Sequence, residues 1–168
     1  MKHTLLPAED FVERRAKFFS KMPANSIAIF SAASELTRSN DTEYLFCQNK
    51  HFYYLTGFNE PDALLVLIKE ETGRTVLFSR EKDPLQEVWH GRRIGQEKAV
   101  EEYLVDECYS IAEIDEFLPS YLNHKACLLY PFGENEVFES QLLAWTAKLK
   151  SAVKLGYSAP SVRQNASE

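Results

Sequence analysis

The stretch EVWHGRRIG, residues 87–95, contains side-chain types that binding and catalytic pockets use. Trp89 can provide a flat apolar surface, and Gly91 permits a backbone turn that other residues avoid. Arg92 and Arg93 could each bind a carboxylate through two hydrogen bonds, or simply form ion pairs with this acidic chain. No nucleophile–base pair and no metal-ligand cluster accompanies them. These residues alone therefore predict a recognition or interface loop.

The remaining chemistry-bearing residue types are scattered along the chain. The sequence has no HExxH, GxSxG or GxGxxG motif and no phosphate loop, so surface or structural roles are expected for the four histidines. The three cysteines form no CxxC pair and are expected to be reduced, mostly buried thiols. These residues are His3, His51, His90, His124, Cys47, Cys108 and Cys127.

A second polar stretch, SNDTEY at residues 39–44, contains Asp41 and Glu43. Asn and Asp favour turns, so ordinary turn chemistry explains the composition. A loop that presents a carboxylate to a ligand is the functional alternative. The residues themselves leave both interpretations open.

Composition limits the classes of protein that this chain can belong to. It has 168 residues, the size of one ordinary domain, and 45% of them are hydrophobic. Its net charge of −6 and its short, diluted basic stretches argue against nucleic-acid binding. We find neither a run of about 20 apolar residues nor a signal peptide, so we expect no membrane partner and a cytoplasmic location.

Hydrophobic periodicity and turn residues predict helices at 7–22, 95–104, 110–122 and 135–150. Helix 110–122 begins with Ser110 and Glu113 at capping-box spacing, and Pro119 makes its end uncertain. Asn135 is expected to cap the last helix. The predicted buried faces contain Phe11, Phe18 and Met22 in the first helix, and Val137, Leu142, Trp145 and Leu149 in the last.

Short apolar runs predict strands at 26–32, 107–111 and 125–131, and the runs at 63–71 and 74–80 flank a turn and predict a hairpin. The aromatic run 51–58 fits a strand or a short helix equally well. This order of elements predicts an α/β fold with a mixed β-sheet flanked by helices. The tail from Gly156 is small, polar and unpatterned, and is expected to be a linker.

Several segments together resemble one known family. They are TRSNDTEYLFCQNKHFYYLTGFNEPDALLVLI, then VLFSR, then EVWHGRRIGQEKA, in this order over most of residues 9–150. The combination of YLTGFNEP with WHGRR resembles the N-terminal domain of bacterial Xaa-Pro aminopeptidase, or aminopeptidase P. The prolidase and creatinase relatives have comparable but less similar segments.

The resemblance implies a fold related to the ribonuclease-H-like architecture and a short helix at 51–58. Residues 1–155 would form the N-terminal domain, and 156–168 a linker toward a C-terminal "pita-bread" catalytic domain that this sequence lacks. That domain would hold two manganese ions, and its substrate would be a peptide with proline in second position. No cofactor or catalytic residue is therefore expected in this chain.

The resemblance also implies roles for two residues. Trp89 would line the substrate pocket, and Asp41 would reach the site of a neighbouring subunit in a dimer or tetramer. His90, Arg92 and Arg93 receive no role. The alternatives are a stand-alone peptide-binding or oligomerisation module of this fold, or the matching domain of a prolidase.

Overall fold

The computed structural model describes residues 6–33, 48–85, 87, 93–133, 135–151 and 159–164. Its helices are α1 Ala8–Lys21, α2 Lys50–Thr56, α4 Gln96–Tyr103, the 3₁₀ turn η2 Ile111–Glu113, α5 Ile114–Leu122 and α6 Glu136–Ser151. Its strands are β1 Ser26–Ser31, β2 Leu64–Lys69, β3 Gly73–Ser79, β4 Glu107–Ser110, β5 Cys127–Tyr130 and β6 Ser161–Gln164.

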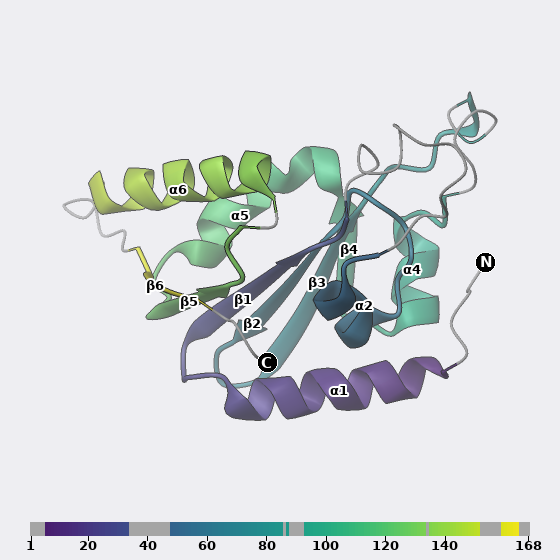
Figure 1. Cartoon of the computed structure of the whole chain (residues 1–168), viewed down its shortest axis with the longest axis horizontal. Helices are drawn as coiled ribbons and strands as arrows, with labels where there is room; N and C mark the ends of the chain where they lie inside the picture. The colour runs from purple at the N-terminus through teal and green to yellow at the C-terminus, as the bar shows by residue number, and fades with distance from the viewer. Residues whose placement is uncertain are drawn as a thin grey trace.

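The strands form one sheet in the order β4-β3-β2-β1-β5-β6. The pairs β1–β2 and β2–β3 are antiparallel, whereas β3–β4, β1–β5 and β5–β6 are parallel. Helices α5 and α6 cover one face of this sheet, and α1, α2 and α4 cover the other (Figure 1). The predicted α/β fold with a mixed sheet flanked by helices is confirmed.

Each face of the sheet has its own apolar core because side chains alternate along a strand. In β1, Ile27 and Ile29 pack on the α5–α6 side, whereas Ala28 and Phe30 pack on the α1–α2–α4 side. All six residues of β1 are buried, as expected for a strand covered on both faces. None of the described helices is long and apolar enough to cross a membrane.

Most predicted elements lie where the sequence places them, including a helix rather than a strand at α2. The predicted face of α6 is wrong at its first residue, because Val137 is 76% exposed and Phe138 is 5% exposed. Phe138, Leu142, Trp145 and Leu149 have i, i+4, i+7 and i+11 spacing, which puts them on one face and turns Val137 to solvent.

The predicted helix end at residue 122 is confirmed, with Pro119 inside α5. Two other details differ from the expectations. Ser110 caps the 3₁₀ turn η2, accepting from the Ala112 N–H at 3.2 Å, rather than an α-helix. Residues 161–164, expected in the linker, form β6 beside β5, so part of that segment belongs to the sheet. A domain boundary at residue 155 stays a prediction.

Candidate functional site

The two residues that the sequence assigns to a substrate pocket, Asp41 and Trp89, lie outside the described residues. His90 and Arg92 lie outside them too. What the structure describes is how the chain enters and leaves the two segments that contain these residues, 34–47 and 88–92.

Both segments leave the sheet at the same edge. In the strand register Ser31, the last residue of β1, lies opposite Leu64, and Leu64 lies opposite Phe78 near the end of β3. Ser110 at the end of β4 lies opposite Ser79. We call this the carboxyl edge, because β1, β3 and β4 all end there. Ligands of α/β sheets commonly bind outside such an edge.

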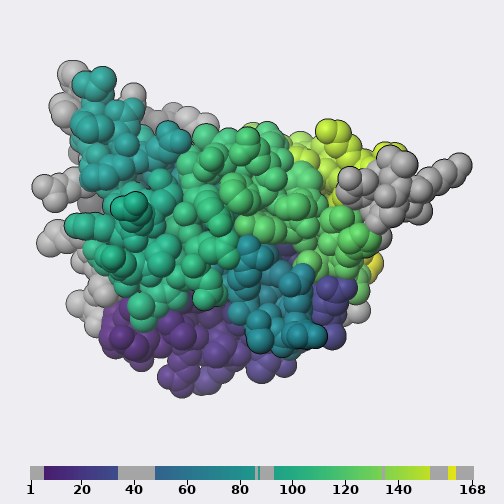
Figure 2. Space-filling model, turned by 180° about the vertical axis from the view of Figure 1, so that it is seen from behind, coloured from purple at the N-terminus to yellow at the C-terminus, as the bar shows by residue number. Residues whose placement is uncertain are grey.

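The chain after β3 extends well beyond the carboxyl edge. Its described part, drawn in teal, projects past α4 in Figure 1, and the same projection stands out from the molecular surface in Figure 2. The chain then returns to Gly95, whose φ of +82° lies in the region that favours glycine, and α4 begins at the next residue.

Gln48 holds together the two ends of the segment that contains Asp41. Its Oε1 accepts from the backbone N–H of Ala33 at 2.7 Å and from that of Asn49 at 2.9 Å. Its Nε2 donates to the carbonyl oxygens of Phe58 at 3.2 Å and Glu60 at 2.8 Å. One amide side chain therefore connects both ends of this segment to residues 58–60.

Helix α2 is fixed directly after this segment. The Asn49 side chain accepts from the N–H groups of His51 and Phe52, which caps the helix. At its other end Gly57 has a φ of +70°, and a Cβ there would lie 2.7 Å from the Phe11 ring. The sequence YLTGF thus needs glycine because only glycine fits this close contact.

The ends of the segment that contains Trp89 are held by a group of charged residues, which we call the Glu60 cluster: Glu60, Arg80, Lys82, Glu87 and Arg93. Glu60 Oε2 accepts from the backbone N–H of Ile94 at 2.8 Å, and Glu60 Oε1 lies 3.8 Å from Arg80 Nη2. Glu87 Oε1 accepts from the Arg93 N–H at 3.2 Å, and Arg93 Nη1 donates to the carbonyl of Glu81 at 2.9 Å. Residues on both sides of Trp89 are therefore linked to the sheet.

Burial makes the Glu60 carboxylate unusual. Its side chain is 16% exposed, and removal from water raises the pKa of Glu60. The hydrogen bond from Ile94 and the charge of Arg80 partly offset that rise by favouring the ionised form. The sequence assigned no role to Arg93, but the structure gives it one within this cluster. Its charge favours the ionised form of Glu60, and its backbone N–H donates to Glu87.

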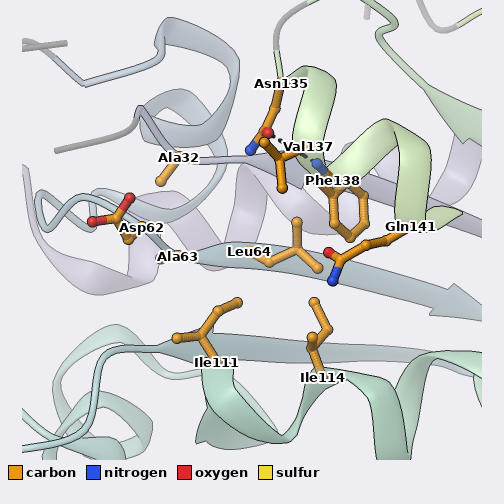
Figure 3. A pocket seen from close by; sticks show the side chains of 10 residues that line it. All are labelled: Ala32, Asp62, Ala63, Leu64, Ile111, Ile114, Asn135, Val137, Phe138 and Gln141. Carbon is orange, nitrogen blue, oxygen red and sulfur yellow. Dashed lines mark hydrogen bonds between the residues drawn. The ribbon is translucent and has the colours of Figure 1, made fainter. Parts of the chain in front are cut away.

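A pocket of about 360 Å³ opens at the carboxyl edge on the α5–α6 side (Figure 3). Ile111 and Ile114 face Val137 and Phe138 across it, with Leu64 of β2 between them. Its polar groups are few, and the Asn135 side chain is already used, since its Oδ1 accepts from the Phe138 N–H at 3.1 Å. The remaining lining residues are Ala32, Asp62, Ala63 and Gln141. This composition suits an apolar group.

The described residues offer little reactive chemistry. Burial raises the pKa of Cys108 to about 11, so this thiol stays protonated and is a poor nucleophile at neutral pH. Within the described ranges, no three His, Cys, Asp or Glu side chains lie close enough together to hold a metal ion. The described part of this edge can hold loops and bind an apolar group, but it cannot supply a metal centre.

Sequence reasoning assigned no role to Gln48 or Glu60. Both lie in stretches that were singled out, and Glu60 is the acidic residue of GFNEP. An acidic residue between two apolar strands, directly before a proline, was the available signal. The side chain of Glu60 binds Ile94, 34 residues away, and its carbonyl binds Gln48, 12 residues away. No local sequence pattern could reveal either contact.

Comparison with known proteins gives consistent results. Residues 11–130 match the model of the family "Aminopeptidase P, N-terminal domain". The chain is 40% identical to Xaa-Pro aminopeptidase of Haemophilus influenzae over 155 residues and 37% identical to that of Escherichia coli. These alignments cover 86% and 91% of this chain but only 36% and 35% of the two relatives.

Solved structures agree with the sequence relatives. A histidine-to-alanine variant of Escherichia coli aminopeptidase P superimposes with a TM-score of 0.88 at 35% identity, covering 97% of this chain and 37% of that one. The Pseudomonas aeruginosa aminopeptidase PepP gives 0.85 at 36% identity, covering 96% and 36%. The chain therefore spans little more than a third of the length of these bacterial proteins.

Proposed function

Because the chain belongs to the aminopeptidase P N-terminal domain family, we propose that it is the non-catalytic N-terminal domain of a metal-dependent Xaa-Pro aminopeptidase. Such an enzyme removes the residue that precedes proline at the start of a peptide. In this proposal the chain lines part of the substrate pocket and contributes to a dimer or tetramer. The reaction itself takes place in a catalytic domain outside this sequence.

One observation carries this proposal more than any other. The segments that contain Asp41 and Trp89 leave the same edge of the sheet, and a described residue next to each, Gln48 and Ile94, is hydrogen-bonded to Glu60. A domain that presents two loops toward a partner needs such a rigid base, because loosely held side chains orient a substrate poorly.

Trp89 is assigned to the substrate-pocket surface and Asp41 to the site of a neighbouring subunit. A tryptophan offers a large apolar area with few rotatable bonds, which suits an extended peptide, and it helps to exclude water from the reacting bond. An aspartate can accept hydrogen bonds from a peptide or pair with a cation of the partner subunit.

The proposal assigns the two manganese ions to the catalytic domain. The described residues contain no group of three ligand side chains that fits a metal, so no metal-binding role is given to them. When bound, the ions would activate water for attack on the peptide bond. The cytoplasmic location of the whole protein stays a prediction.

The isolated chain provides the first test. Purified residues 1–168, supplied with manganese and an Xaa-Pro peptide, are expected to release no N-terminal residue. Turnover that survives further purification and disappears with a chelator would contradict the proposed division of labour.

A second candidate is a stand-alone peptide-binding module of the same fold, which the apolar pocket of about 360 Å³ favours. Titration of the chain with an Xaa-Pro peptide separates the two. Binding that shifts the NMR signals of Ile111, Ile114 and Phe138 supports the module, and unchanged signals at millimolar peptide support the first proposal. The coding sequence after residue 168 gives an independent answer.

A further inference from the structure

Three consecutive hydrogen bonds connect the two segments at the carboxyl edge. The Ala33 N–H donates to Gln48 Oε1 at 2.7 Å, and Gln48 Nε2 donates to the backbone carbonyl of Glu60 at 2.8 Å. The Glu60 carboxylate then accepts from the Ile94 N–H at 2.8 Å. The path thus runs from the start of one segment to the end of the other through two residues, Gln48 and Glu60.

We infer that Glu60 is a positioning residue that couples Ala33 to Ile94, the described residues that border the segments containing Asp41 and Trp89, so that a displacement at one changes the other. This inference rests on the proposed function for its biological meaning, because it is the proposed function that assigns both segments to substrate pockets. The coupling itself depends on the hydrogen bonds of the described residues and can be measured without any activity.

Glu60 is suited to this role because it uses its main chain and its side chain in opposite directions. Its carbonyl faces Gln48, whereas its carboxylate faces Ile94 and Arg80. The next residue is Pro61, whose ring restricts the backbone conformation of the residue before it, Glu60. A shift of Ile94 is therefore transmitted to the Glu60 carbonyl instead of being absorbed by backbone rotation.

The surroundings of Glu60 oppose independent movement of the two sides. The Glu60 and Arg80 side chains are 16% and 10% exposed, so water cannot readily replace a broken contact there. Glu60 Oε1 and Arg93 Nε are buried and make no hydrogen bond to any described residue. The Glu60 carboxylate therefore has few alternative partners, and the bond that its other oxygen, Oε2, accepts from Ile94 matters more as a result.

The role of Glu60 differs from simple support of the fold. The hydrogen bonds of Glu60 connect the ends of loops, not core residues. The core side chains of β1 and β2 are packed by α1, α2, α5 and α6 without it. Loss of the carboxylate should loosen the carboxyl edge first and leave the centre of the sheet protected. This difference separates a positioning residue from a residue that only stabilises the whole domain.

Amide hydrogen exchange followed by NMR tests the inference on the chain itself. In Glu60→Ala, the amide of Ala33 lies on the far side of the path and is expected to exchange roughly 3- to 30-fold faster, the range typical of coupled sites. In Gln48→Ala, the amide of Ile94 should respond by a similar factor, because coupling is reciprocal. The core amides of Val66 and Ile29 should exchange at their original rates.

A matched variant serves as the control. Glu101→Ala removes an exposed glutamate of α4, and it should not change exchange at Ala33 or Ile94. Glu60→Gln keeps an oxygen that can accept from Ile94, so it should restore part of the protection lost in Glu60→Ala. If Glu60→Ala does not fold, Glu60→Gln and Gln48→Ala still provide the comparison.

The double variant Gln48→Ala/Glu60→Ala decides the outcome. Effects at Ala33 and Ile94 that are clearly non-additive support coupling through Glu60. Additive effects, or a uniform rise in exchange that includes Val66, would overturn it. Coupling in a chain that itself cleaves an Xaa-Pro peptide would count against the proposed function alone, whereas a chain without turnover and without coupling would count against this inference alone.

Discussion

Arg15 offers the sharpest test of how the helices below the loops are held. It lies in the middle of α1 and is 2% exposed. Its guanidinium donates to three backbone carbonyls: Leu55 at 2.8 Å, Tyr103 at 3.2 Å and Leu104 at 2.9 Å. One side chain thus joins α1 to the ends of α2 and α4, the two helices that follow the loop segments. We consider the substitution Arg15→Met.

Two opposing effects decide the magnitude. Burial lowers the pKa of Arg15 to about 10, so the guanidinium is still charged at neutral pH. Keeping this charge away from water costs on the order of 3 kcal/mol. Each charge-assisted hydrogen bond contributes about 1.5–3 kcal/mol, and methionine makes none of the three. Hydrogen bonding therefore prevails, and Arg15→Met should lower the free energy of unfolding by about 2–4 kcal/mol.

Urea denaturation followed by circular dichroism measures this loss directly. The control is Arg14→Met, because Arg14 is only half-buried, donates to the Tyr54 carbonyl and stacks 4.3 Å from the Tyr54 ring. That control should lose about 1 kcal/mol or less. An Arg15→Met protein as stable as the original would show that the cost of burying the charge cancels its hydrogen bonds, and would refute our reasoning.

Two further predictions concern Gly57 and Glu107. Gly57→Ala should lower the free energy of unfolding by about 2–4 kcal/mol, since the new methyl group clashes with Phe11 and alanine is strained at a φ of +70°. The control is Gly133→Ala, which has a φ of +101° but no atom within 4 Å, and it should lose only the part caused by backbone strain. Equal losses in the two variants would contradict a clash with Phe11. The hydrogen bond from Arg74 lowers the pKa of Glu107 below its ordinary value of 4.5. Its contribution is therefore complete above pH 4.5 and lost as the pH falls through the lowered value. Thermal unfolding against pH should show Glu107→Gln less stable near pH 6 and converging with the original protein in acid; a constant difference would contradict this.

Elements with a strong local pattern could be predicted from the sequence. The hairpin β2–β3 has two apolar runs around a short turn, and α1 has Phe11 and Phe18 on one face. Patterns failed where one residue shifts the phase, as at Val137, or where an edge strand has few apolar residues, as in β6. An edge strand has a neighbouring strand on one side only and often carries polar or charged residues, so it need not show a continuous apolar run.

The charged residues that hold the helices and the carboxyl edge could not be predicted. Arg15 and Glu60 are ordinary charged residues in the sequence, and a charged residue is expected at the surface. Their importance comes from backbone carbonyls and amides that are 40, 89 and 34 residues away. Only the fold brings those groups together. Asp41 and Trp89 were selected through family resemblance, and their roles stay predictions.

The central claim is that this chain shapes a pocket whose reacting centre belongs to another domain. A chimera tests it most directly: Escherichia coli Xaa-Pro aminopeptidase in which this chain replaces the segment that it matches. We expect the chimera to cleave an Xaa-Pro peptide. In it, Trp89→Ala should reduce kcat/KM roughly 10- to 100-fold, mainly through KM, since about 1.4–3 kcal/mol of contact with the peptide is lost. Trp145→Phe changes a buried tryptophan of α6 that donates to Asp115, and it should leave kcat/KM unchanged. An active chimera that is indifferent to Trp89→Ala would contradict the account.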